Sequence, residues 1–276
     1  MKYFVSSDIH SAFTPWMEAL NSAGFDINNP EHKIIVCGDL FDRMDETVKT
    51  YEFAKQMSDD DRLIYIRGNH EDLLFDCMKD IECGRIPDSH HFSNGTIKTI
   101  CQFCGEKEWI VYDPTWRDKI CHIMKPILDW INESAVNYAK IDKYVFVHGW
   151  IPVLKQDGYP YHYLRNRVFD FNPNWENATL EEWEQARWLN GMEMWSQPKH
   201  RLSDYTVVVG HWHCSFGWSH IDQKYKEFPD KSHKHFQYSF QPWVKDGIIA
   251  LDSCVAYSGK INCIVIEDEF SEGSNE

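Results

Sequence analysis

Short apolar runs rich in β-branched and aromatic residues recur along the chain, and a small polar cluster follows each of five of them. Runs of this length and composition predict buried strands, because β-branched and aromatic side chains favour extended backbone. These five runs cover residues 3–5, 34–36, 63–66, 144–147 and 207–209. Further strands are predicted near residues 248–251 and 261–267, where we expect them to complete a second sheet.

Helical periodicity fills the gaps between the first strands. Apolar residues return at helical spacing over 14–23, 45–57 and 71–81, which predicts helices that cover the sheet. The alternation of strands and helices predicts an α/β fold.

The stretch at residues 84–142 interrupts this alternation and is predicted to be an insertion. Within it we expect a short strand pair around Thr96–Cys101 and Glu108–Val111, followed by a helix over Trp116–Asn132. We expect the insertion to form a cap over the edge of the sheet where the polar clusters meet.

The clusters that follow the five strands contain residue types that bind metals. In order they read Asp8-Ile9-His10, Gly38-Asp39-Leu40-Phe41-Asp42-Arg43, Gly68-Asn69-His70-Glu71, His148-Gly149 and Gly210-His211-Trp212-His213. Strand ends of one sheet lie side by side, so distant residues can converge on one rim. A single such cluster usually marks a turn or a helix cap. Burying the ionisable side chains of five clusters is costly unless cations or partner groups compensate their charges. The pattern therefore predicts a centre for Mn, Fe or Zn.

The order and chemistry of the five motifs resemble the calcineurin-like metallophosphoesterase superfamily, from Met1 to about Ile266. The segments that look like its branch of serine/threonine protein phosphatases and diadenosine tetraphosphatases are Asp42-Arg43, Arg67-Gly68-Asn69-His70-Glu71, Leu251-Asp252-Ser253-Cys254-Val255 and Gly259-Lys260. Met44 and Trp150 depart from the pattern, since glycine is usual at both positions. The resemblance implies a four-layer α/β/β/α sandwich with a cap inserted into it.

The resemblance also implies two metal ions and a set of ligands for each. The first ion would bind Asp8, His10 and His213, Asp39 would bridge both ions, and Asn69, His148 and His211 would complete the second site. Such a bridge holds divalent ions roughly 3.5 to 4 Å apart, and a water shared between them becomes a hydroxide that attacks phosphorus in line. Mn²⁺ is the expected ion, with Fe or Zn as alternatives.

In the family pattern His70 is the general acid beside the leaving group, with Asp42 bonded to its other ring nitrogen. The alternative, in which Asp42 only caps the next helix, is less favoured because Asp45 is the better cap candidate. Arg43 offers a bidentate fork for phosphate oxygens. Arg187 is the candidate for a second phosphate-binding arginine, and a surface ion pair is its alternative role.

Length and charge narrow the class of protein. The motifs span nearly all of the 276 residues, so we expect one domain over 1–276 with a mobile acidic tail at 271–276. A formal charge of −15 argues against binding long nucleic acids but suits a phosphorylated small molecule or a phosphopeptide. No apolar run approaches the roughly 20 residues of a membrane span, and Met1-Lys2 leads straight into a strand. We therefore expect a cytoplasmic enzyme without a membrane partner.

Two features leave alternatives open. The nine cysteines suggest reduced thiols, and Cys101 and Cys104 have zinc-ligand spacing but lack a second pair. The aromatic stretches at 159–195 and 216–243 are either core or a stacking platform for a nucleobase.

The expected function is hydrolysis of phosphomonoesters, ahead of dinucleoside polyphosphate cleavage and phosphodiester hydrolysis. A protein-binding scaffold without catalysis is the alternative of another class, and the intact ligand set argues against it because clustered charges are costly. The sequence does not fix the oligomeric state.

Overall fold

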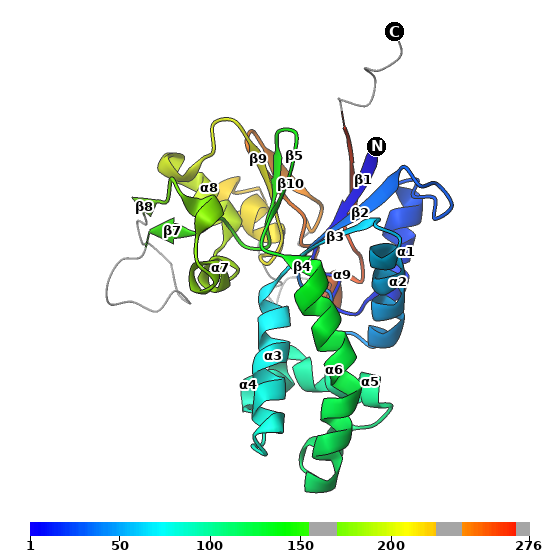
Figure 1. The fold of residues 1–276 in the computed structure, drawn as a ribbon. Coiled ribbons are helices and arrows are strands. Elements are labelled where there is room, and N and C mark those ends of the chain that lie inside the picture. Colours follow the sequence, from blue (N-terminus) through cyan, green and yellow to red (C-terminus); the bar gives the residue numbers. More distant parts are fainter. Residues whose placement is uncertain (155–169, 225–238, 269–276) are drawn as a thin grey trace, which may run out of the picture.

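The computed structural model describes residues 1–154, 170–224 and 239–268, and Figure 1 shows its ribbon. The predicted acidic tail at 271–276 lies outside these ranges, as do Tyr159, Tyr161 and Tyr163 of the first aromatic stretch.

Two five-stranded mixed sheets form the centre of the molecule (Figure 1). The first has the order β12-β1-β2-β3-β4, with β1 (Lys2–Ser6), β2 (His32–Cys37), β3 (Leu63–Ile66), β4 (Ala135–Val136) and β12 (Ile264–Glu267). The second has the order β10-β11-β9-β6-β5, with β5 (Ala139–Ile141), β6 (Tyr144–Phe146), β9 (Thr206–Val209), β10 (Trp243–Lys245) and β11 (Ile248–Ala250). A small hairpin pairs β7 (Val153–Leu154) with β8 (Asp170–Phe171). In each large sheet the central strands are parallel, so their carboxyl ends lie along one edge.

Successive side chains of a strand pack on opposite faces of its sheet. In β1, Phe4 packs on the helices while its neighbour Val5 faces the second sheet. In β9, Val208 joins the cluster between the sheets, whereas Val207 packs on the opposite side. Since successive side chains of a strand point to opposite faces, each sheet buries both faces.

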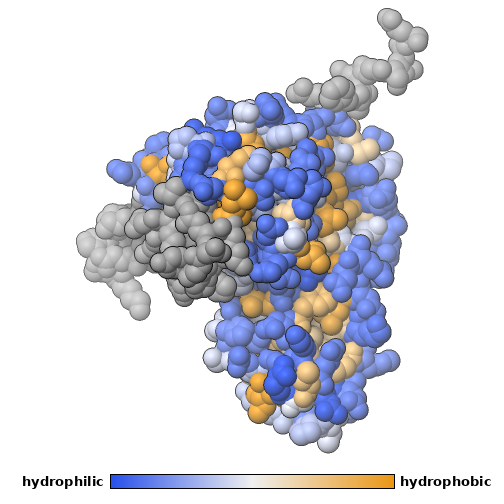
Figure 2. Space-filling model, turned by 60° about the vertical axis from the view of Figure 1, so that its left-hand side comes forward, coloured by the Kyte–Doolittle hydropathy of each residue, from blue (hydrophilic) through white to orange (hydrophobic). Residues whose placement is uncertain are grey.

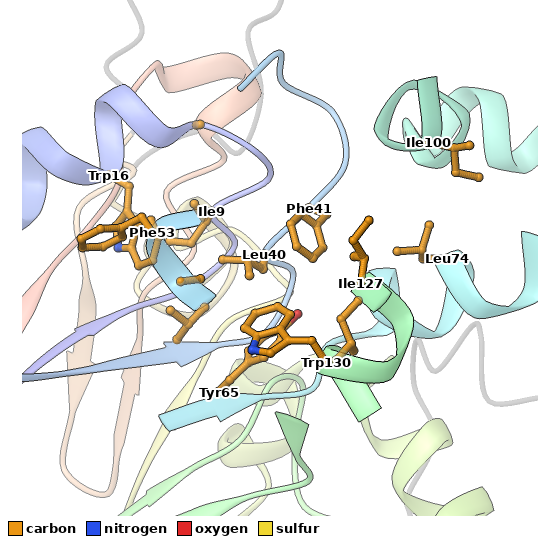
Figure 3. Close-up of a cluster of buried hydrophobic side chains, with 14 of the residues drawn as sticks. Ile9, Trp16, Leu40, Phe41, Phe53, Tyr65, Leu74, Ile100, Ile127 and Trp130 are labelled. Atoms are coloured by element: carbon orange, nitrogen blue, oxygen red, sulfur yellow. The ribbon is translucent and has the colours of Figure 1, made fainter. Parts of the chain in front are cut away.

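Helices cover the outer face of each sheet. Their bounds are α1 (Phe13–Ser22), α2 (Thr47–Asp59), α3 (Asn69–Glu82), α4 (Ser89–Asn94), α5 (Thr96–Cys104), α6 (Arg117–Ser134), α7 (Leu180–Ala186), α8 (Gly191–Ser196) and α9 (Val255–Ser258). Trp16 of α1, Phe53 of α2 and Trp130 of α6 pack with Tyr65 on the first sheet, as Figure 3 shows. Helices α7 and α8 cover the second sheet. The predicted α/β sandwich, with two mixed sheets flanked by helices, is therefore confirmed.

Two predicted elements are wrong. Residues Thr96–Cys104 form helix α5 and Glu108–Val111 a 3₁₀ helix, where a strand pair was expected. Burial on one helical face decides this, because Ile97, Ile100 and Cys101 all enter the core at spacings of three and four. Strand β12 is the second error: it pairs antiparallel with β1 and so completes the first sheet, not the second.

The predicted insertion is a helical lobe beside the site and not a lid over it. Helices α4, α5 and α6 pack with α3 in the lower part of Figure 1, and residues 135–141 return to the two sheets as β4 and β5. Among the residues that line the site cavity, the insertion contributes Asn94. The lobe therefore supports the site from one side.

Hydrophilic residues cover most of the face shown in Figure 2, and apolar residues appear there as scattered patches. None of the helices in the described ranges has the length and apolar character that crossing a bilayer requires.

Candidate metal centre

The polar clusters meet at the edge where the parallel strands of both sheets end. A cavity of about 150 Å³ opens there. Its lining consists of His10, Asp39, Arg43, Asn69, His70, Asn94, Trp188, His211, His213, Asp252, Cys254, Val255 and Ala256. The predicted convergence of distant motifs on one rim therefore occurs in the fold.

The backbone of these loops is strained. Left-handed φ angles occur at Asp8, His10, Ser11, Asp39, Asp42, Arg43, His211 and Cys254. Such conformations cost about 1 to 3 kcal/mol each in residues other than glycine, and they persist only where the surroundings hold them. Clustering at one cavity is typical of a functional site.

Asp39 presents its two carboxylate oxygens to different groups of side chains. Oδ1 lies 3.3 Å from His148 Nε2, while Oδ2 lies 3.8 Å from His10 Nε2 and 3.8 Å from His70 Nε2. The structure thus contains two clusters suited to a metal ion, His10 with Asp39 and His70, and Asp39 with His148 and His211. Because both clusters share Asp39, its position fits the predicted bridging role.

The ring orientations of two histidines are fixed by backbone carbonyls. Nδ1 of His10 donates to the carbonyl of Phe41 at 3.0 Å, and Nδ1 of His148 donates to the carbonyl of Cys37 at 2.8 Å. Each Nε2 is therefore left as an acceptor, that of His10 at the cavity and that of His148 beside Asn69 and Asp39.

Three acceptors converge around His148. Its Nε2 lies 2.8 Å from Asn69 Oδ1 and 3.3 Å from Asp39 Oδ1. All three residues are buried, and acceptors this close repel one another unless a donor or a cation lies between them. The donor set therefore fits a metal ion.

Asp8 links the two halves of the site. Its carboxylate accepts hydrogen bonds from the side chain of Ser7 and from the backbone N–H of His211, the latter at 3.0 Å to Oδ2. Its Oδ1 lies 4.0 Å from His10 Nε2. Asp8 is thus placed beside the first cluster, as the resemblance implies.

His213 lines the cavity but lies outside the two compact clusters. Its Nδ1 lies 2.6 Å from Ser215 Oγ. Asp252, which the ligand assignment overlooked, lines the same cavity and is buried. The signal for Asp252 was present in the sequence, because it follows the apolar strand β11 as the other acidic residues follow theirs.

Glu71 is a second residue without a predicted role. Its buried carboxylate accepts from the backbone N–H groups of Gly68 at 2.7 Å, Leu40 at 2.9 Å and Asp39 at 3.1 Å. Gly68 must be glycine here, because a Cβ would collide with the Asp39 side chain. The hydrogen bonds of Glu71 therefore hold the loop after β2 next to the start of α3.

His70 and Asp42 form the predicted pair. Nδ1 of His70 donates to Asp42 Oδ2 at 2.7 Å. Asp42 also accepts from Thr96 Oγ1 at 3.0 Å and from Thr99 Oγ1 at 2.7 Å. The alternative role of Asp42 as a helix cap is not seen, since α2 begins after Glu46. The two threonines were missed because their segment was predicted to be a strand.

The surroundings of His70 Nε2 allow two roles. Its distance from Asp39 places it within reach of a metal ion, whereas Arg43 Nη2 donates to the same nitrogen at 3.2 Å. A neighbouring guanidinium disfavours a second cation at that atom. The contact with Arg43 therefore argues against a metal ion at Nε2, and the resemblance implies a role in proton transfer.

The two arginines have different surroundings. Arg43 is exposed at the cavity. Arg187 is buried and outside the cavity lining, and its guanidinium donates to Asp72 Oδ2 at 2.7 Å and to Asn137 Oδ1 at 2.6 Å. Arg187 was considered either for phosphate binding or for a surface ion pair. The structure shows an ion pair with Asp72, and Arg187 is buried there.

Burial shifts the protonation of the whole centre. It raises the pKa of Asp8 and of Asp39 well above the ordinary carboxyl value, and neighbouring carboxylates add to both shifts. It lowers the pKa of His10 and His148, and lowers the pKa of His211 to about 3. The imidazoles therefore stay neutral to lower pH than a free imidazole, as metal ligands must be, whereas the carboxyls keep their protons to higher pH than free carboxyls, and a cation must displace any proton that remains.

This difference predicts how metal affinity depends on pH. A raised carboxyl pKa means that affinity falls as the pH falls through that pKa, by about tenfold per pH unit for each displaced proton. The imidazoles add no loss near pH 6.5, because their lowered pKa values keep them neutral there. Calorimetric titration with Mn²⁺ from about pH 5 to 7.5, in buffers of different ionisation enthalpy, measures the released protons. Binding without proton release would contradict this prediction.

The cysteines play no part in these clusters. Within the ranges that the structure describes, no group suited to a metal ion contains a cysteine. Cys101 is buried in the core of the helical lobe, and burial raises its pKa to about 12, which disfavours the thiolate that zinc requires.

No curated protein matches the sequence. A putative diadenosine tetraphosphatase of known structure is 13% identical, with 96% of this chain and 89% of that one covered and a TM-score of 0.48. A protein-tyrosine phosphatase of a psychrophilic Shewanella is 13% identical, with 97% of this chain and 75% of that one covered and a TM-score of 0.46. A serine/threonine phosphatase of Saccharomyces cerevisiae is 15% identical, with 77% of this chain and 61% of that one covered and a TM-score of 0.42.

The family assignment comes from the sequence itself and does not depend on these structures. The family model described as "Calcineurin-like phosphoesterase" matches residues 1–244, which include the motifs after β1, β2, β3, β6 and β9. Together with clustered histidine and aspartate side chains suited to metal ions, this match identifies a metal-dependent hydrolase. The chain belongs to the calcineurin-like phosphoesterase family.

Proposed function

We propose that the protein hydrolyses phosphomonoesters at a centre of two metal ions. The observation that carries the proposal is the arrangement at His70, whose Nδ1 is bonded to Asp42 while Arg43 lies against its Nε2. A proton donor and a phosphate-binding fork thus stand together beside the shared carboxylate of Asp39.

Asp8, His10, Asp39, Asn69, His148, His211 and His213 would hold the ions. Bound ions supply Lewis acidity and an activated water for attack on phosphorus. Mn²⁺ is our first choice because the donors mix carboxylate, amide and imidazole groups, and Fe or Zn accept the same donors.

Arg43 would bind the non-bridging oxygens of the phosphate. Its guanidinium donates a hydrogen bond to the His70 ring, and a phosphate dianion offers a stronger, charge-assisted partner. Substrate binding would therefore draw Arg43 away from His70 and free Nε2.

His70 would then take up a proton from water at Nε2 and give it to the leaving-group oxygen. The negative charge of Asp42 stabilises the imidazolium form that gives up this proton and fixes the ring orientation. Thr96 and Thr99 of the helical lobe also donate hydrogen bonds to that carboxylate, so the lobe contributes to the placement of the acid.

A second candidate is the hydrolysis of dinucleoside polyphosphates. The favouring observation is Trp188, which lines the cavity and meets the His211 ring edge-to-face at 5.8 Å. An indole in this position suits stacking with a nucleobase.

A panel of aryl phosphates, phosphopeptides, nucleotides and dinucleoside polyphosphates, run on the metal-loaded protein, separates the two candidates. Turnover of none of them, with metals bound, would favour a binding scaffold.

Removing the Arg43 guanidinium tests the preference for phosphomonoesters. We expect Arg43→Ala to lower kcat/KM on a monoester by about a hundredfold, because one bidentate arginine contributes a few kcal/mol. A diester presents fewer charged oxygens and should lose less, and the metal content should stay unchanged. Arg85→Ala is the matched control, since Arg85 pairs with Asp80 on the exposed surface of the lobe. Equal losses on monoester and diester would favour a phosphodiesterase.

A further inference from the structure

The helical lobe contains a second cluster of side chains suited to binding a metal ion, outside the lining of the site cavity. It consists of Asp76 on α3 with His90 and His91 on α4, and one ligand atom from each residue lies within 4.8 Å of the others. None of these three residues lines the site cavity. Helices α3 and α4 lie together in the lower part of Figure 1.

His91 is the unusual member of the cluster. Its side chain is 0% exposed, yet neither ring nitrogen has a hydrogen-bond partner. A buried imidazole without partners is costly, so such a group needs a compensating interaction. The ring is aimed at Asp76, with Nε2 3.5 Å from Oδ2.

The other two groups complete a coordination set. The His90 ring lies 3.9 Å from that of His91 between centroids, at the solvent side of the helix, and Asp76 is 64% exposed. Ligands of a tetrahedral zinc ion with bonds of about 2.0 Å lie about 3.3 Å apart, close to the His91–Asp76 distance. Asp80 and Asp88 are near enough to act on His91 electrostatically, and their charges favour a cation there.

We propose that Asp76, His90 and His91 bind a transition-metal ion of the zinc type, separate from the catalytic pair. Two imidazoles and one carboxylate are donors that zinc prefers, with water in the fourth position. The accessible Asp76 and His90 give the ion an entry path, and the ion satisfies the buried imidazole of His91.

The ion would cross-link α3, which carries the general acid His70, to α4, which precedes the threonines that bond Asp42. Helix α3 begins with Asn69 and His70, whereas α4 runs through Gly95 into Thr96, a hydrogen-bond donor to Asp42. Gly95 has a φ of 91°, and a Cβ there would collide with the backbone of Arg43. Fixing α4 against α3 therefore fixes the segment that supports Asp42.

Zinc counting on matched variants tests the site. After equilibration with zinc and removal of the free ion, His90→Ala and Asp76→Asn should each hold one zinc fewer than the unaltered protein. His122→Ala and Asp129→Asn, exposed positions on α6 of the same lobe, should lose none. His91→Gln provides a third variant that keeps a buried polar side chain.

A thermal shift supplies a second readout. At free zinc about 100 times its Kd, the unaltered protein should gain about 5 °C in Tm more than His90→Ala gains. The comparison is independent of the catalytic centre, because the centre at Asp39 is the same in both proteins. Equal zinc content and equal shifts in the variants and the unaltered protein would overturn the proposal. Equal losses in the two controls would do the same.

Discussion

Asp39→Asn is expected to abolish nearly all phosphoesterase activity and to weaken metal binding in both clusters. One carboxylate faces both clusters of imidazoles, so its single charge serves two cations. Metal ions contribute several kcal/mol to the stabilisation of the transition state, and about 1.4 kcal/mol corresponds to tenfold in rate. A loss of about a thousandfold or more in kcat/KM follows.

The substitution is conservative in shape. Asp39 Oδ1 accepts from the backbone N–H of His70 at 3.0 Å, and the amide oxygen of asparagine can accept the same bond. The fold should therefore survive, as circular dichroism can establish. Asp45→Asn is the matched control, because Asp45 lies in the same loop, is exposed and pairs with Lys98. Full activity and an unchanged metal count in Asp39→Asn would disprove the bridging role.

His70→Asn is expected to retain both metal ions while turnover on substrates with poor leaving groups falls by roughly 10² to 10⁴. That factor is the usual contribution of general acid catalysis, and it matters most when the leaving oxygen needs a proton. Aryl phosphates with acidic phenols should lose much less. The measurement is a plot of log kcat/KM against leaving-group pKa for both proteins, which should be steeper for the variant.

Metal content decides between the two roles that His70 could take. His10→Asn is the contrasting variant, since His10 Nε2 faces Asp39 Oδ2 and its Nδ1 donates to the carbonyl of Phe41. We expect His10→Asn to lose metal and His70→Asn to keep it. If His70→Asn lost an ion, His70 would be a ligand, and equal losses across all leaving groups would point the same way.

The sequence predicted the strands and the motifs after them because both depend on local pattern. Apolar runs of β-branched and aromatic residues in β1 and β2 mark buried strands, and the acidic and histidine residues directly after them reach the rim by the geometry of a parallel sheet. The placement of Asp42 beside His70 followed from the family pattern, and the structure shows their hydrogen bond.

What the sequence did not predict depends on contacts between distant segments. Thr96 lies 54 residues after Asp42, and its β-branched neighbours favoured a strand locally, whereas packing on the core favours a helix. The sheet that β12 joins is likewise set by its pairing with β1 and not by its own residues. Arg187 offered a charge without a partner in the sequence, and the fold supplies Asp72.

The bond between Asp8 and the backbone of His211 spans 203 residues, which matters for the order in which the chain is made. The amino-terminal carboxylates leave the ribosome long before the histidines that share their ions. Domains generally fold as units, so these acidic loops can complete a two-ion centre only after residues beyond His211 have emerged. For the same reason, a fragment that ends before β9 would lack the second half of the centre, and activity should require both halves to be present together.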